Sequence, residues 1–258
     1  MMFKTILCLL DGVRYDAVRL IDNWVGLPNF QNIIKNGIWF TNVFTFEPVL
    51  TNHCQSKILV GHQDYNRHQT VFDTLGQLGL RTASIGTDPY TGRGATANWD
   101  NLYDANHHYR SDQVRTDVVK EILKDFDFIY VYFVEPDEYA HVCRDAHRHI
   151  YSFQSPYIWA IKRCDERVGQ IIKVAEKVCP GNYNIICLSD HGMTDGGRHS
   201  IATWTTEEVM HVTLFCSGVS FKKAMIENSR LYITDIAHGI VNLYNPEYNA
   251  HIFQNVKI

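Results

Sequence analysis

Residues 188–199, LSDHGMTDGGRH, combine a carboxylate and two imidazoles with a loop of glycines and small polar residues. Asp190 and His191 directly follow an apolar run, and His199 ends the stretch. Such side chains contribute little to burying the end of a strand, but carboxylate oxygens and imidazole nitrogens bind divalent cations of the zinc type. The stretch therefore predicts part of a metal site.

Further ligand types follow two other apolar runs. Asp11 comes directly after the run 3–10, and Asp137 and His141 come just after the run 127–134. Asp137 and His141 are four residues apart, so one helical turn would place both on one face. A single aspartate after a strand is usually an N-cap or a turn residue. The whole set, three aspartates and three histidines at one sheet edge, fits two divalent cations, which can hold the attacking and leaving oxygens of a phosphoryl group.

Such a site also needs a nucleophile, and Thr51 is the candidate hydroxyl. It precedes a short apolar segment that ends at Gly61, which predicts a helix beginning near the threonine. A helix N-terminus attracts phosphate through its free N–H groups and its dipole, and a bound cation lowers the pKa of a hydroxyl. A threonine at this position, taken alone, is usually an N-cap.

Short apolar runs alternate with helix-period segments, which predicts a single α/β domain over residues 1–258 with helices on both faces of a mostly parallel sheet. No repeat, low-complexity stretch or Pro/Ser-rich linker divides the chain. The carboxyl ends of strands are where open α/β sheets bind ligands. The predicted strands cover residues 3–10, 81–87, 127–134, 183–189 and 211–217, and the predicted helices cover residues 28–37, 70–79, 111–126, 155–178 and 233–244.

Segments without periodicity are expected to form a minimal cap over this edge, at residues 62–69, 87–110 and 142–154. Loops that follow strands often carry substrate contacts. Their arginines can clamp a phosphate or a carboxylate, and their tyrosines can stack on a base or line a pocket. Both types are also ordinary surface or packing residues. The candidate substrate contacts in these loops are Tyr90, Arg93, Arg110 and Tyr151.

The composition excludes some classes of partner. A formal net charge of −4 over 258 residues gives no basic surface for nucleic acid as a structural partner. The apolar run before Asp11 is too short for a membrane span or a signal peptide. Seven cysteines without CxxC spacing indicate a reducing compartment rather than a disulfide framework. We expect a cytoplasmic protein that acts on a small molecule without a membrane partner, and its oligomeric state stays open.

The stretches LLDGVRYD, TNHCQSKILVG, VEPDEYAH and SDHGMTDGGRHS follow the order typical of the alkaline phosphatase superfamily. The chain most resembles the type I phosphodiesterase/nucleotide pyrophosphatase branch, and it is also similar to the catalytic domain of glycosylphosphatidylinositol ethanolamine-phosphate transferases. The resemblance runs from residue 4 to about residue 243. It implies that one cation is held by Asp137, His141 and His199, and the other by Asp11, Asp190 and His191 together with Thr51, the covalent nucleophile.

The resemblance also bears on three further questions of assignment. Thr51 stands ten residues before the helix-ending glycine, the spacing that the superfamily shows for its nucleophile. Asn52 is the candidate for the asparagine that relatives use as a second oxyanion donor. His199 fits the family's Gly-x-His-Gly segment, whereas His211 and His238 are more simply interpreted as packing residues.

These observations predict a phosphodiesterase or nucleotide pyrophosphatase that acts on a small soluble diester with two divalent cations, Zn²⁺ first and Mn²⁺ as the alternative. The same side chains would also serve phosphonate or phosphate monoester hydrolysis, or transfer of a phosphoethanolamine-type group to an alcohol. Sulfate ester hydrolysis is disfavoured because relatives with that activity use Cys or Ser where Thr51 stands. A catalytically silent binding protein is disfavoured because all six ligands and the hydroxyl are present.

Overall fold

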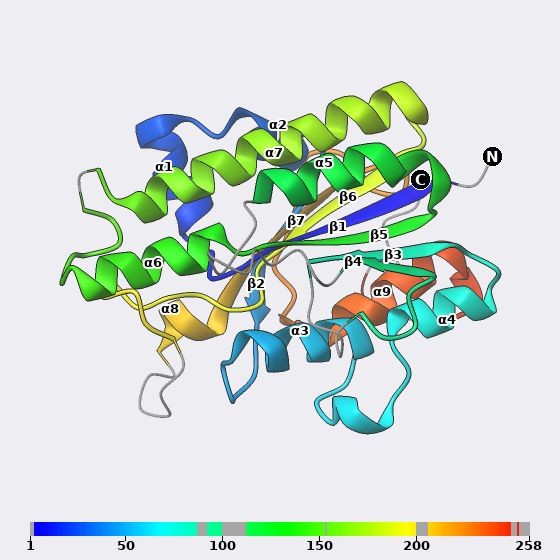
Figure 1. The fold of residues 1–258 in the computed structure, drawn as a ribbon, viewed down its shortest axis with the longest axis horizontal. Coiled ribbons are helices and arrows are strands. Elements are labelled where there is room, and N and C mark those ends of the chain that lie inside the picture. The colour runs from blue at the N-terminus through cyan, green and yellow to red at the C-terminus, as the bar shows by residue number, and fades with distance from the viewer. Residues whose placement is uncertain are drawn as a thin grey trace.

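The computed structural model is one α/β domain in which helices cover both faces of a central sheet (Figure 1). The predicted fold class is therefore confirmed. The residues that the structure describes are 3–86, 92–99, 112–152, 154–199, 206–248 and 252.

The strands are β1 Lys4–Leu10, β2 Gly37–Phe44, β3 Thr82–Ile85, β4 Ala97–Trp99, β5 Phe128–Phe133, β6 Tyr183–Leu188, β7 His211–Gly218, β8 Met225–Glu227 and β9 Leu231–Tyr232. The helices are α1 Ala17–Val25, α2 Pro28–Lys35, α3 Thr51–Val60, α4 Val71–Gln77, α5 Asp112–Ile122, α6 Glu135–Asp145, α7 Pro156–Val178, α8 Glu207–Met210 and α9 Asp235–Tyr244. Short 3-10 turns cover Tyr65–Arg67, Leu123–Asp125 and Pro246–Tyr248.

The sheet has the strand order β4-β3-β5-β1-β6-β7-β2-β8, and β9 also pairs with β2. The run from β4 to β6 is parallel, and β7 is antiparallel to both of its neighbours. β1 lies between β5 and β6, with Leu10 paired to Phe133 and Leu9 paired to Leu188. The carboxyl ends of these three strands therefore meet at one edge of the sheet.

Two apolar cores explain why the central strands are apolar on both faces over most of their length. Ile6, Cys8 and Leu10 of β1 face a core shared with α1, α2, α5, α6 and α7. Leu7 and Leu9 face a second core shared with α3, α4 and α9. Figure 1 shows the same division of the helices between the two faces. A strand buried on both faces has no polar side to alternate with, as is usual in parallel sheets.

The predicted strands and helices all have counterparts, displaced by a few residues at their ends. The predictions missed α1, β2, the short helix α8 and the short edge strands β4, β8 and β9. The predicted loop 142–154 begins too early, because residues 142–145 form the last turn of α6. Of the other expected cap segments, 62–69 contains the 3-10 turn beside α3, and most of 87–110 lies outside the described residues, which include 92–99.

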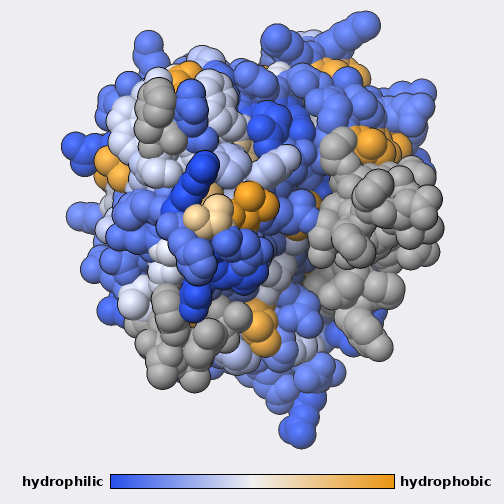
Figure 2. All heavy atoms as spheres, turned by 60° about the vertical axis from the view of Figure 1, so that its left-hand side comes forward, coloured by the Kyte–Doolittle hydropathy of each residue, from blue (hydrophilic) through white to orange (hydrophobic). Residues whose placement is uncertain are grey.

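Within the described residues, no helix combines the length and apolar character needed to cross a membrane. The face shown in Figure 2 is largely hydrophilic, with hydrophobic side chains scattered in small separate spots. Scattered apolar side chains of this kind are normal on a globular surface.

Candidate metal centre

Asp11 lies at the carboxyl end of the central strand, where the chain turns sharply at Gly12. Asp11 is 1% exposed, and one of its carboxylate oxygens accepts a hydrogen bond from the Tyr132 hydroxyl on β5. Gly12 has φ +68°, a conformation that side chains disfavour, and a Cβ there would press on the backbone of Asp137. The Gly12 amide donates to Asp190 Oδ1 over 3.3 Å, so the turn ties β1 to the loop after β6.

Asp190 and His191 follow the neighbouring strand β6, and both are fully buried. His191 Nε2 lies 3.3 Å from Asp11 Oδ1 and 3.7 Å from Asp190 Oδ2. One potential ligand atom from each of these three side chains lies within 4.8 Å of the others. The parallel register of β1 and β6 thus brings Asp11 and Asp190 together although 178 residues separate Asp190 from Gly12.

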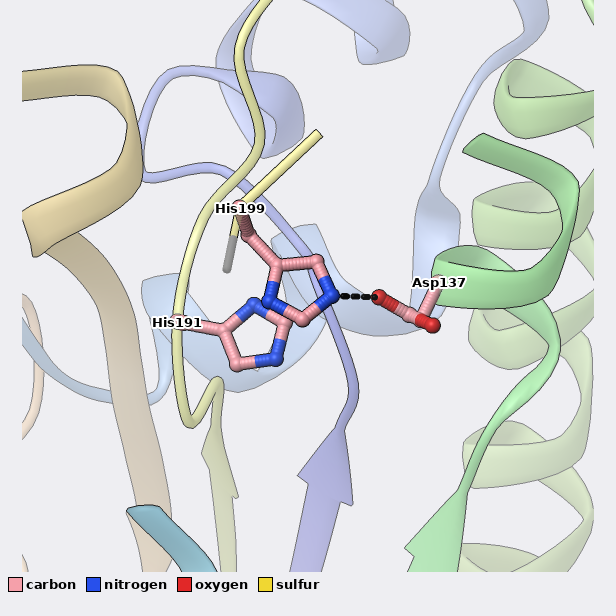
Figure 3. Close-up of side chains that lie close together, drawn as sticks. All are labelled: Asp137, His191 and His199. Atoms are coloured by element: carbon pink, nitrogen blue, oxygen red, sulfur yellow. Dashed lines mark ion pairs between the residues drawn. The ribbon is translucent and has the colours of Figure 1, made fainter. Parts of the chain in front are cut away.

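A second group gathers around Asp137, in the first turn of α6. His199 Nε2 lies 3.3 Å from Asp137 Oδ1, and His141 Nε2 lies 3.4 Å from Asp137 Oδ2. The helical spacing of four residues places His141 beside Asp137, as predicted. Figure 3 shows His199 reaching toward Asp137 with His191 stacked beside it. Potential ligand atoms of His191, Asp137 and His199 also lie within 4.8 Å of one another, so His191 adjoins both groups.

The three histidines share one arrangement of their ring nitrogens. Nδ1 of His191 lies 3.1 Å from the Gly192 carbonyl, that of His199 lies 3.0 Å from the Val49 carbonyl, and that of His141 lies 2.9 Å from the Gly197 carbonyl. A carbonyl oxygen can only accept a hydrogen bond, so the proton belongs on each Nδ1. The lone pair is then on Nε2, which faces the carboxylates. Metal-binding histidines are commonly fixed in this way.

The site contains buried carboxylate oxygens whose charge is not compensated by hydrogen bonds, an arrangement that favours bound cations. Asp11 Oδ1, Asp137 Oδ1 and Asp190 Oδ2 are buried without a hydrogen-bond partner. Burial, together with the charges of Asp190 and Asp137, raises the pKa of Asp11 well above its usual value, and burial raises the pKa of Asp190 to about 7. Burial and the neighbouring His191 lower the pKa of His199 to about 4. Three buried carboxylates beside imidazoles are the donor set that divalent cations of the zinc type take.

Thr51 is the first residue of α3, and its hydroxyl points into this cluster. Its Oγ1 lies 3.2 Å from His191 Nε2. The helix continues to Val60 and ends at Gly61, as the sequence predicted. The structure therefore brings the candidate nucleophile and all six candidate ligands to one place, at the positive end of a helix dipole.

The described candidate substrate contacts form hydrogen bonds to residues other than the candidate metal ligands. Asn52 is exposed, and its side-chain oxygen accepts from the His53 amide over 2.9 Å. Arg93 is exposed, and its guanidinium donates to the His68 carbonyl over 3.0 Å. The Tyr151 hydroxyl donates to Asp16 Oδ1 over 2.8 Å. Tyr90 and Arg110 lie outside the described residues.

The two rival histidines lie in other surroundings. His211 Nε2 bonds to the Thr41 carbonyl over 2.9 Å, and its ring stacks on Tyr15 at 3.9 Å between centroids. His238 Nε2 bonds to the Gly61 carbonyl over 2.9 Å, at the far end of α3 from Thr51. Both have the partners of ordinary packing histidines.

Sequence reasoning missed Tyr132, whose hydroxyl contacts Asp11. A signal was available, because a tyrosine two residues before the end of the run 127–134 lies at the same sheet edge as Asp11. No local pattern could have indicated the Val49 carbonyl that orients His199, since any residue type can supply a carbonyl.

Comparison with known proteins supplies a family. The sequence model of the family described as type I phosphodiesterase / nucleotide pyrophosphatase matches residues 53–244, about three quarters of the chain. The match includes Asp137, His141, Asp190, His191 and His199, whereas Asp11 and Thr51 precede it. Among curated protein sequences, none matches the chain at a significant level.

Solved structures with the same fold include a phosphodiesterase and a putative sulfatase. Murine ectonucleotide pyrophosphatase/phosphodiesterase 5 has a TM-score of 0.67 and 16% identity, over 94% of this chain and 95% of that one. An inactive threonine-to-alanine variant of the same murine protein, in complex with AMP, has a TM-score of 0.67 and 13% identity, over 95% of each chain. A putative sulfatase from Bacteroides fragilis has a TM-score of 0.71 and 14% identity, over 97% of this chain and 76% of that one.

Proposed function

The chain belongs to the type I phosphodiesterase/nucleotide pyrophosphatase family, and on that premise we propose that it hydrolyses small phosphate diesters or nucleotide pyrophosphates. The observation that carries the proposal is the position of Thr51, at a helix N-terminus and 3.2 Å from the histidine that adjoins both ligand groups. A nucleophile, an anion-binding helix end and a cation site thus occupy one sheet edge.

The proposed ligands divide into two sets. Asp11, Asp190 and His191 would hold one divalent cation, with Thr51 as a further ligand, and the other would be held by Asp137, His141 and His199. The donor chemistry favours Zn²⁺, and Mn²⁺ is the alternative. When bound, the two cations would supply Lewis-acid stabilisation of the phosphoryl oxygens and would favour the ionised form of the hydroxyl.

The residues of the chain then carry out two displacements. Thr51 Oγ1 forms a bond to phosphorus as the bond from phosphorus to the leaving alcohol or phosphate breaks. Water next attacks the phosphorus of phosphothreonine, which releases the monoester product and restores the hydroxyl. The N–H groups in the first turn of α3 would stabilise the negative charge on the phosphoryl oxygens in both steps.

The comparisons support a nucleotide substrate and a threonine nucleophile. The murine relative was solved with AMP in a variant that a threonine-to-alanine change makes inactive. The sulfatase-like structures share the fold, so sulfate esters are the alternative that an experiment must exclude.

A substrate panel tests the proposal. Purified protein with Zn²⁺ or Mn²⁺ would be assayed on bis-p-nitrophenyl phosphate, the p-nitrophenyl ester of thymidine 5′-monophosphate, p-nitrophenyl phosphate and p-nitrophenyl sulfate. We expect metal-dependent turnover of the two diesters at kcat/KM values well above those for the monoester and the sulfate. Preference for the monoester or the sulfate would contradict the proposal, and so would turnover that survives removal of the metal.

We also propose a cytoplasmic location. All seven cysteines are free and buried, which suits a reducing compartment. Imaging of a tagged protein in its own cells tests this directly.

A further inference from the structure

Arg14 follows the Asp11–Gly12 turn and is almost completely buried. Its guanidinium binds Asp16 through two nitrogens, over 3.0 and 2.8 Å, and binds Asp195 Oδ1 through a third, over 2.6 Å. The guanidinium also stacks 5.0 Å from the centre of the Tyr151 ring, and the Tyr151 hydroxyl donates to the same Asp16. Arg14 is thus held rigidly on one side and offers a fixed donor to Asp195 on the other.

Asp195 lies in the loop that joins His191 to His199. Besides Arg14, its carboxylate contacts His149 Nε2 over 3.2 Å, and its backbone carbonyl accepts from the Ile150 amide over 2.9 Å. These contacts tie the middle of the loop to the first strand-to-helix turn and to the segment after α6.

Gly197 fixes the same loop from the opposite side. It has φ +67°, and a Cβ there would collide with the Ala140 carbonyl of α6, so only glycine allows this approach. The Gly197 carbonyl accepts from His141 Nδ1 over 2.9 Å. Two residues after Asp195, the loop therefore orients one histidine of the Asp137 group, and four residues after Asp195 it supplies another, His199.

We propose that Arg14 is a positioning residue for the cation site formed by Asp137, His141 and His199, and that it acts through its ion pair with Asp195. The proposal rests on the two-cation site proposed above. By holding Asp195, Arg14 fixes the loop whose Gly197 carbonyl sets the ring orientation of His141 and whose end carries His199.

The other cation site does not depend on this ion pair. Asp11 directly follows β1, Asp190 lies two residues after the end of the adjacent strand β6, and His191 follows Asp190. The Gly12 amide and the Tyr132 hydroxyl hold the two carboxylates. Loss of the Arg14–Asp195 pair should therefore weaken one site and leave the other unchanged.

The test compares Asp195→Asn with Asp117→Asn by zinc binding. Asp195 is 60% exposed, so its replacement should leave the fold intact. Asp117 is a matched control, because it is 56% exposed and pairs with Lys120 over 2.8 Å on α5, away from the candidate ligands. Equilibrium dialysis against buffered Zn²⁺ gives the number of ions bound and both affinities, and imidazole ¹⁵N NMR reports which histidines each ion shifts.

We expect wild type and Asp117→Asn to bind two Zn²⁺ ions, and Asp195→Asn to bind the second ion about 10- to 100-fold more weakly, as for other residues that orient metal ligands. The weakened ion should be the one that shifts His141 and His199. Arg14→Lys, which keeps the charge but loses the forked donor, should weaken the same ion.

Unchanged affinities in Asp195→Asn, or an equal loss at both sites, would overturn the positioning role while leaving the proposed function intact. A wild-type protein that binds no Zn²⁺ or Mn²⁺ would overturn the two-cation site itself, and the positioning role with it.

Discussion

The rings of His191 and His199 stack face to face, with their centroids 4.0 Å apart and their planes at 13°, although the two residues come from opposite ends of one loop. Each ring turns Nδ1 toward a backbone carbonyl. Nε2 of His191 faces the carboxylates of Asp11 and Asp190, whereas Nε2 of His199 faces that of Asp137. The stack thus joins the two ligand groups side by side, with Thr51 next to His191.

Replacing His141 by alanine should remove one cation without disturbing the core, because the side chain is 28% exposed. Loss of one Lewis acid is worth several kcal/mol of transition-state stabilisation, so we expect kcat/KM to fall by about 10²-fold or more. Steady-state hydrolysis of bis-p-nitrophenyl phosphate measures the loss, and metal analysis should give one ion per chain. Two bound ions with normal turnover would remove His141 from the site.

The two sites should lose their cations at different pH values. Metal binds the deprotonated ligands, so a proton competes wherever the pH is below the pKa of a ligand. The pKa of Asp190 is raised to about 7, and affinity at its site should fall about tenfold per pH unit as pH falls below 7. The pKa of His199 is lowered to about 4, so this histidine competes little above that pH. Zinc content should be measured from pH 8 to pH 5. It should fall first at the site whose ion changes the imidazole ¹⁵N chemical shifts of His191.

Removal of metal should destabilise the protein at pH 8, because the carboxylates of Asp11, Asp137 and Asp190 then lie close together without a cation. A free Zn²⁺ concentration of 100 times Kd should stabilise the fold by about 2.7 kcal/mol for each site. Thermal unfolding with EDTA and with Zn²⁺ measures the difference. Asp190→Asn should unfold at a higher temperature than wild type in EDTA, and an equal or lower temperature would contradict the electrostatic argument.

Tyr132→Phe should weaken the site at Asp11, because it removes the hydroxyl that orients this carboxylate. We expect a 10- to 100-fold loss of affinity for the cation at that site. Tyr130→Phe is the matched control: it lies two residues earlier on the same strand, and its hydroxyl donates to Gln55 rather than to a ligand. Equal effects of the two substitutions on zinc affinity would contradict the role of the Tyr132 hydroxyl in orienting Asp11.

The sequence predicted the sheet best where strands are buried on both faces. β1, β5 and β6 are continuous apolar runs, and the residues that follow them, such as Asp11 and Asp190, lie together because parallel strands end at one edge. The spacing of Asp137 and His141 likewise translated directly into one helical face. These inferences needed only local periodicity and the direction of the strands.

Other features depend on contacts between distant residues. β2 pairs antiparallel with β7, whose earliest residue follows the end of β2 by 167 positions, and polar residues such as Asn42 interrupt its pattern. Arg14 and Asp195 are 181 residues apart, and a lone arginine and a lone aspartate in loops carry no signal that they will meet. Tyr151, a candidate substrate contact, donates its hydroxyl to Asp16, which is 135 residues away in the sequence, and no local pattern indicates this partner.

The most direct test of the central claim, that Thr51 is the nucleophile of a two-cation phosphodiesterase, measures zinc content and diester hydrolysis together in Thr51→Ala. We predict that the variant keeps two Zn²⁺ ions per chain and that its turnover of bis-p-nitrophenyl phosphate falls to the level of protein-free buffer with Zn²⁺. A variant that keeps both ions and hydrolyses the diester at a rate near that of wild type would contradict the account.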